Sequence, residues 1–143
     1  MLFSRIVRTG PEKVFAICKN TEASATMSDG ECVVFSVSTT ANWGSDILKA
    51  TAAAQATAAG IVSGNDILTG NFGTIQVYGF HPNVKTTAAA LTAGTIVTSD
   101  AAAAVLAASV AALANITDQR IGVCLKLGAA NRAGVFIAHM GMA

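Results

Sequence analysis

The sequence predicts a mainly β domain: a small barrel or sandwich of short antiparallel strands with one or two alanine-rich helical inserts. Two observations carry this prediction. Short runs rich in valine, isoleucine and phenylalanine are separated by glycine, asparagine and aspartate, and two alanine-rich segments interrupt them. The 143 residues suit one domain with its own core. We therefore expect a single β-rich domain over 1–143, with an N-terminal arm at 1–11.

The composition indicates a protein that buries much of its surface in an assembly. Hydrophobic residues make up 52% of the chain and charged residues only 12%, against about a quarter in typical soluble domains. Because the centres of protein interfaces are depleted in charge, we expect a homo-oligomer. The net charge of +1 gives no electrostatic attraction for nucleic acid or an anionic membrane, so neither is an expected partner.

Signals for secretion or membrane insertion are weak. The charged residues near the N-terminus come too early for the apolar core of a signal peptide. The longest uncharged apolar run, Ala101–Ile116, is shorter than the roughly twenty residues that span a bilayer. The three cysteines lie far apart without CxxC spacing, which favours buried, reduced thiols. We expect a soluble protein made in a cytoplasm.

Two strands are expected in the first third of the chain. Residues 14–18 form a short run of β-formers, and a turn signal at Ser28–Gly30 leads into a clearer run at 32–37. In that second run Val33, Phe35 and Val37 share one face by the period-two rule, and we expect this face to lie in the core.

Residues 60–80 hold the organising stretch of short strands and tight turns. Ile75 and Val77 point to one face of a strand at 74–78, because side chains alternate along a strand. Gly79 follows where a bulge or a close backbone approach is the usual reason for glycine. A further turn is expected at Phe80–Asn83, where a histidine precedes a proline.

The alanine-rich segments 46–59 and 101–114 are helices or ordered loops. Alanine favours helix, yet 46–59 has no amphipathic stripe. In the second segment Ser99–Asp100 is a candidate N-cap. Leu106, Val110 and Leu113 share one helical face, which favours helix there.

The C-terminal part is predicted to be a pair of strands. Ile121, Val123, Leu125 and Leu127 alternate with smaller or polar residues, and a second apolar run follows at 135–140. We predict that 121–127 and 135–140 pair antiparallel, with Val123 and Leu125 buried.

No arrangement of residues in the sequence points to catalysis, a metal or a cofactor. His81 precedes a proline and His139 lies in a terminal strand, neither with metal-ligand spacing. Cys18 and Cys32 with a histidine would need the fold to assemble a site. The glycines of residues 60–73 lack the setting of a nucleotide-binding loop. We expect a protein that is not an enzyme.

Several short segments stand in a recognisable order along nearly the whole chain. They are Arg5–Phe15 (RIVRTGPEKVF), Lys19–Asn20, Ala59–Ile61, Asp66–Ile67, Gly73–Phe80 (GTIQVYGF), Ala93–Val97, Ile121–Leu125 and Val135–Ile137. In this order they resemble the small capsid decoration (cement) proteins of tailed bacteriophages. The chain departs from that pattern at Ala101–Asn115, where the alanine run is unusually long.

The resemblance implies a mostly β, often trimeric protein that binds the outside of an assembled head and clamps neighbouring capsomers. Its partner would be the major capsid protein, its location the virion exterior, and it would need no cofactor. The low charge agrees with large contact areas. Two alternatives stay open: another virion subunit, such as a tail-tube or head-completion protein, or a small β-rich binding domain or enzyme with a site built from Asp66, His81 and Asp118.

The expected contact residues are aromatic side chains in irregular segments, because aromatics dominate interface energetics. The candidates are Phe3, Trp43, Phe72 and Phe80, with Arg5 beside the first of them. The N-terminal arm carries apolar residues and arginines but too little apolar content for its own core. We expect Met1–Arg8 to lie against a neighbouring subunit or the shell.

Overall fold

The computed structural model describes residues 12–42, 44–52, 57–87, 91–107, 120–127 and 131–140. Within these ranges nearly all regular structure is β-strand, which confirms the predicted class; one 3-10 turn lies at Ala101–Ala103. The strands are β1 (Val14–Asn20), β2 (Cys32–Phe35), β3 (Asp46–Lys49), β4 (Ala58–Val62), β5 (Phe72–Lys85), β6 (Ile96–Asp100), β7 (Ala104–Ala107), β8 (Arg120–Leu127) and β9 (Arg132–Met140).

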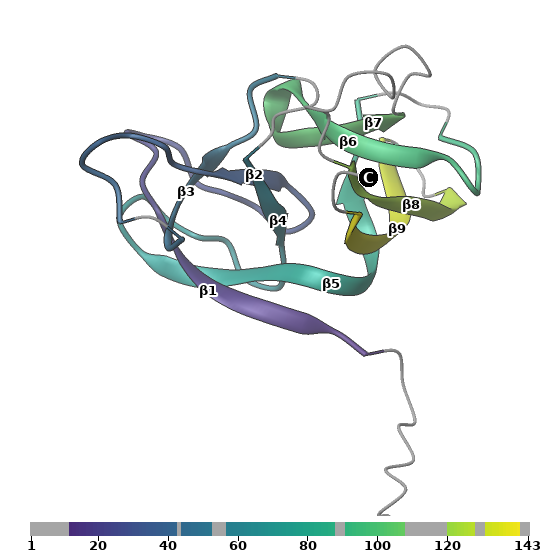
Figure 1. Ribbon diagram of the computed structural model, residues 1–143, viewed down its shortest axis with the longest axis horizontal. Helices are drawn as coiled ribbons and strands as arrows, with labels where there is room; N and C mark the ends of the chain where they lie inside the picture. The colour runs from purple at the N-terminus through teal and green to yellow at the C-terminus, as the bar shows by residue number, and fades with distance from the viewer. Residues whose placement is uncertain are drawn as a thin grey trace, which may run out of the picture.

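Five strands close into a barrel in the order β1-β3-β2-β4-β5, because β5 also pairs with β1 (Figure 1). The β1–β5 ladder is antiparallel and runs from Val14 opposite Tyr78 to Lys19 opposite Phe72. By contrast, β1 pairs with β3 in parallel at Lys19 and Asn20. β1 is therefore paired with β5 along most of its length on one side, but with β3 only at its C-terminal end on the other side.

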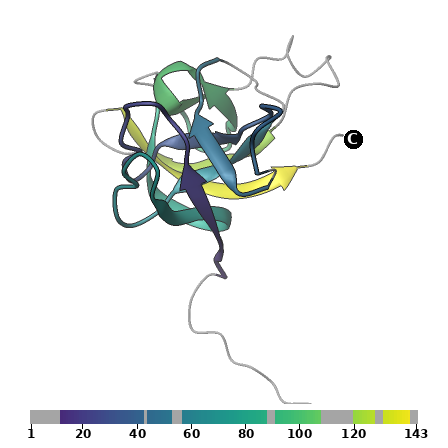
Figure 2. The same ribbon diagram turned by 90° about the vertical axis from the view of Figure 1, so that its left-hand side faces the viewer.

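A second sheet begins at the C-terminal half of β5. That strand is 14 residues long, and from Gly79 onward it pairs antiparallel with β9. The order then continues β9-β8-β6-β7. This sheet lies beside the barrel in Figure 1 and behind it in Figure 2, so β5 ties the two halves of the molecule together.

Two apolar cores result, and β2 and β4 contribute to both. Val33 of β2 faces the barrel interior, whereas Cys32 and Val34 face the second sheet. All five residues of β4 are buried. The barrel core holds Cys18, Met27, Val33, Ile47, Ala59, Val62, Ile67 and Ile75. The larger core holds Cys32, Val34, Ala50, Ala58, Ile61, Val84, Leu91, Val97, Val105, Ile121, Cys124, Ala133, Val135 and Ile137.

The helical predictions for the alanine-rich segments are wrong where the structure describes them. Residues 46–49 are β3 and residues 58–59 begin β4. Residues 104–107 are β7, which pairs with β6, and Asp100 makes no capping hydrogen bond. In β4 and β7 the small side chains of Ala58, Ala59 and Ala104 are buried, and in β3 Ile47 and Leu48 pack into the cores, so tertiary packing overrides alanine's helix preference. Val110 and Leu113 lie outside the described residues.

The strand at 32–37 is shorter than predicted. β2 ends at Phe35, so Val33 and Phe35 contact the barrel core as expected, while Val37 is 74% exposed. The predicted turn at Phe80–Asn83 is also wrong, because β5 continues through it to Lys85. Its pairing with β9 shifts register between His81 and Val84, and a bulge of this kind tolerates Pro82 inside a strand.

The antiparallel pairing of β8 with β9 is confirmed, but the predicted face is wrong. The register shifts between Cys124 and Lys126, which leaves Leu125 as an extra residue without a partner on β9. An earlier register shift lies between Arg120 and Gly122, ahead of Val123. After it Cys124 is fully buried and Val123 is half-buried, while Leu125 at the bulge is 51% exposed. The inward and outward positions from Val123 onward are therefore the reverse of those that simple alternation predicts.

Gly79 marks a close backbone approach, as predicted. Its φ is +98°, and a Cβ built there would lie 2.2 Å from the carbonyl oxygen of Glu12. A side chain would collide with the chain just before β1. Glycine at this position therefore lets the start of β1 lie against β5.

Candidate interaction surface

Large apolar side chains stand exposed on the outside of the barrel over β1 and β5. Ile17 is 72% exposed, Phe72 65% and Phe15 47%. The ladder sets Phe15 opposite Gln76, Ile17 opposite Thr74 and Lys19 opposite Phe72. Paired residues point to the same side of a sheet, and the intervening side chains of Ala16, Cys18 and Ile75 fill the barrel interior. We call Phe15, Ile17, Phe72 and Thr74 the β1–β5 face.

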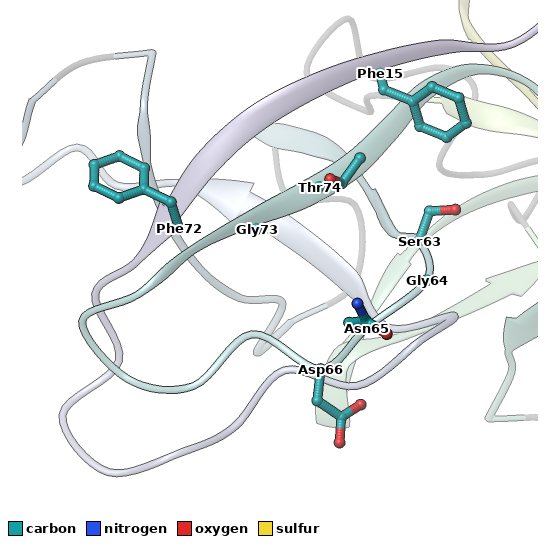
Figure 3. Close-up of a pocket in the computed structure, with 8 residues that line it drawn as sticks. All are labelled: Phe15, Ser63, Gly64, Asn65, Asp66, Phe72, Gly73 and Thr74. Atoms are coloured by element: carbon teal, nitrogen blue, oxygen red, sulfur yellow. The ribbon is translucent and has the colours of Figure 1, made fainter.

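A shallow hollow of about 510 Å³ adjoins this face (Figure 3). Phe15 and Phe72 stand at separate points on its rim, with Thr74 between them. The turn after β4 supplies its polar wall, from Ser63 to Asp66. A surface that joins exposed aromatic rings to hydrogen-bonding groups is suited to a macromolecular partner.

A buried carboxylate and two partly exposed lysines lie together where the barrel meets the second sheet. The Glu31 carboxylate accepts hydrogen bonds from the Lys49 ammonium at 2.8 Å, the Lys85 ammonium at 3.0 Å and the Ser28 amide at 3.0 Å. Burial alone would raise the pKa of Glu31, but these hydrogen bonds together hold it below its ordinary value. Since Lys49 lies on β3 and Lys85 on β5, this cluster joins strands rather than forming an open site.

His81 belongs to the same junction. Its Nδ1 accepts a hydrogen bond from the Asn83 amide, and its Nε2 lies 3.5 Å from the Asp29 carboxylate. Burial lowers the pKa of His81, and the charge of Asp29 partly opposes this shift. Asp29 is held in turn by the Gly64 amide. The imidazole is therefore a neutral packing and hydrogen-bonding group at neutral pH.

The residues of the alternative enzyme site are not brought together in the described structure. Asp66 lies in the wall of the hollow and is exposed, whereas His81 is buried beside Asp29. Asp118 lies outside the described residues. Among the residues that the structure describes, no cluster of histidine, cysteine and carboxylate side chains is placed to hold a metal ion.

The cysteines lie in separate surroundings. Cys18 is in the barrel core, while Cys32 and Cys124 are in the larger core. All three are buried and unpaired by disulfides. Burial raises the pKa of Cys32 to about 12, so its thiol stays protonated at neutral pH. In the part of the chain that the structure describes, no helix is long and apolar enough to cross a membrane.

The predicted contact residues fall in different places. Phe72 is the first residue of β5 and lies on the β1–β5 face. Phe80 is half-buried within β5, close to Gly134 of β9, rather than in an irregular segment. Phe3, Arg5 and Trp43 lie outside the described residues. Their role as contact residues stays a prediction.

Sequence reasoning missed Phe15 and Ile17 as exposed residues. Their strand was expected at 14–18, but apolar residues occur at every position of that run and hide its face preference. The signal lies in size: small Ala16 and Cys18 fit a narrow barrel interior, while the larger side chains alternate with them on the outside.

Comparison with known proteins gives one informative likeness. No family model matches the chain, and no curated protein matches its sequence. A solved structure described as the N base of the head fiber gp8.5 in bacteriophage phi29 is similar to it, with a TM-score of 0.58 and 11% sequence identity. The match covers 92% of this chain and 99% of that chain. At this identity the likeness establishes a shared fold: the chain folds like the base of a phage head fiber.

Proposed function

We propose that the protein is a structural component of a tailed-phage virion that binds the outer surface of the head and stabilises contacts between capsomers. The observation that carries this proposal is the shared fold with the base of a phage head fiber, over nearly the whole of both chains. The low charge and the exposed β1–β5 face agree with it.

The β1–β5 face is the proposed contact with the major capsid protein. Phe15, Ile17 and Phe72 present apolar area to solvent at the edge of a polar hollow, which is the composition of an interface centre with its rim. Aromatic anchors at such a centre contribute a large share of the binding energy. The function requires no catalytic group.

The mechanism is mass action. A protein that binds the assembled shell but not its separated subunits stabilises the shell by RT ln(1 + [L]/Kd) for each site, which is about 2.7 kcal/mol at a hundredfold excess over Kd. Many weak contacts over one head therefore add up to a large resistance against opening. A trimer multiplies this effect, because linked sites bind as a unit.

The test is the composition and stability of purified phage particles. Mass spectrometry of the particles should find the protein at a fixed copy number relative to the major capsid protein. Adding purified protein to heads that lack it should raise the temperature at which the heads release DNA. Absence from the particle would contradict the proposal, and tubes formed by the protein alone would favour the tail-tube alternative.

A matched pair of variants tests the contact face. Phe72→Asp should weaken binding to heads at least tenfold, which corresponds to about 1.4 kcal/mol. Val37→Asp is the control, because Val37 is similarly exposed but lies outside the β1–β5 face. Sedimentation of each variant with heads measures the difference. Equal binding by both variants would remove the β1–β5 face from the contact.

A further inference from the structure

β1 has an open edge next to the β1–β5 face. Its residues from Val14 to Lys19 pair with β5, whereas its other side meets β3 at Lys19 and Asn20. In the described part of the chain, no strand pairs with the other side of residues 14–18. Figure 1 shows this N-terminal half of β1 lying along the outside of the barrel.

The backbone groups at this edge can be assigned from their neighbours. The Lys19 amide donates to Ser45 and the Thr21 amide donates to Ile47, both on the β3 side. The Asn20 amide donates instead to Asn71, on the β5 side. Because backbone groups alternate along a strand, those of Phe15 and Ile17 point to the open edge. These are also the residues of β1 with exposed side chains on the β1–β5 face.

The edge has the form of a slot that is closed at one end. β3 blocks it at Lys19, where Ser45 is already bonded, and it is open toward Val14. A strand entering from the open end must stop at β3. An antiparallel strand in this slot has its first residues at the closed end, beside β3, and leaves the slot at the open end, beside Val14.

We propose that residues 2–8 of a second copy of this chain occupy the slot as an added antiparallel strand. Seven extended residues span about 23 Å at ~3.3 Å each, whereas the five-residue edge from Val14 to Cys18 spans about 17 Å. The segment is therefore long enough to fill the slot and leave a short link. Because side chains alternate along a strand, either Leu2 and Ile6 or Phe3 and Val7 lie on the same side as the exposed Phe15 and Ile17, so both orientations of the added strand offer apolar partners.

A second copy fits better than the same chain. Gly10 precedes Pro11, and a residue before proline is restricted toward extended backbone. Glu12 is also held against Gly79 of β5. In this proposal residues 2–8 therefore reach a neighbour rather than fold back on their own β1, and exchange of identical segments closes a symmetric oligomer. This contact is independent of any phage head, and purified protein tests it.

Disulfide trapping between two chains provides the test. One chain carries Ile17→Cys, and an isotopically heavy chain carries Phe3→Cys, Ser4→Cys or Arg5→Cys, which covers three adjacent registers. The native cysteines are buried and should not compete. Under mild oxidation we expect a mixed-mass covalent dimer in at least one register. Val37→Cys, at 74% exposure against 72% for Ile17, is the matched control and should give none above background.

Two results would overturn the proposal. If the double variant Ser4→Cys/Ile17→Cys forms a bridged monomer, the slot is filled by the same chain. If no register yields a mixed dimer, residues 2–8 do not occupy the slot.

A second pair of variants tests the backbone contact. Ile17→Pro removes an amide that points to the open edge, so the oligomer should dissociate while circular dichroism keeps the β signal. Ile17→Lys keeps the amide but places a charge at the edge, and should weaken the oligomer at least tenfold. An oligomer that both variants leave intact by light scattering would contradict the proposal.

Discussion

The carboxylate of Glu31 is almost buried and bonded to two lysines from different strands. Replacing it by glutamine leaves both ammonium groups without their counter-charge, so Glu31→Gln should lower the free energy of unfolding by about 1–3 kcal/mol at neutral pH. Urea denaturation measures this loss. A change below about half a kcal/mol would mean that the two lysines find other partners.

The loss should depend on pH in a defined direction. Because the pKa of Glu31 is lowered on folding, its charged form favours the folded state, and the advantage of the wild type over Glu31→Gln is present above about pH 4.5. This advantage of the wild type should shrink as the pH falls below 4.5 toward the pKa of Glu31 in the folded protein. The lowered pKa of His81 acts at higher pH, with stability falling as the pH drops below 6.5. Melts of both proteins across this range separate the two effects.

Two residues of β8 have opposite roles despite similar chemistry. Ile121 is fully buried in the larger core, whereas Leu125 is half-exposed at a bulge. Ile121→Ala should therefore cost about 2–5 kcal/mol, as other large-to-small core changes do. Leu125→Ala should cost less than about 1 kcal/mol. Equal losses in denaturant melts would show that the bulge does not place Leu125 at the surface.

At the scale of elements, Gly79 allows the chain just before β1 to pack closely against β5. Gly79→Ala introduces a Cβ at positive φ and pushes it against the Glu12 carbonyl. Gly94 has a similar φ of +88° but open space around it, so Gly94→Ala carries the backbone cost alone, about 1–2 kcal/mol. Thermal melts should show a larger loss for Gly79→Ala. Hydrogen exchange should show faster opening of β1 in Gly79→Ala. Equal losses of thermal stability in Gly79→Ala and Gly94→Ala would show that the close approach of Gly79 to Glu12 has no effect on stability.

Strands were predictable from the sequence where one face is buried and the other is exposed to solvent. β9 follows that rule, since Ala133, Val135 and Ile137 are buried while Phe136 and Ala138 are only half-buried. β2 does not, since Cys32 and Val33 both lie in cores, and a strand buried on both sides leaves no alternation to read. The continuation of β5 through Pro82 and the bulge at Leu125 were also hidden, because register shifts arise from strand pairing.

The candidate surface was partly predictable. Phe72 was named as a contact residue from its aromatic side chain and lies exposed on the β1–β5 face. Phe80 was named for the same reason and is half-buried beside β9. Sequence alone could not separate them, because their exposure depends on whether another strand covers their part of β5.

At the scale of the whole molecule, the barrel and the second sheet are parts of one structure. β2 and β4 contribute side chains to both cores, β5 belongs to both sheets, and the cluster around Glu31 joins β3 to β5. Neither half can open without exposing apolar surface of the other. The mainly β class was predictable from composition and turn residues, whereas this sharing arises from long-range pairings that no local pattern encodes.

The long ladder between β1 and β5 has a mechanical consequence. A force applied to the chain ahead of Val14 and directed along β1 pulls this strand lengthwise past β5. The hydrogen bonds of an antiparallel ladder lie perpendicular to the strands, so those between Val14 and Lys19 bear the load together rather than one after another. A tether that joins this domain to a neighbour through its N-terminal end therefore resists sliding with the strength of the whole ladder.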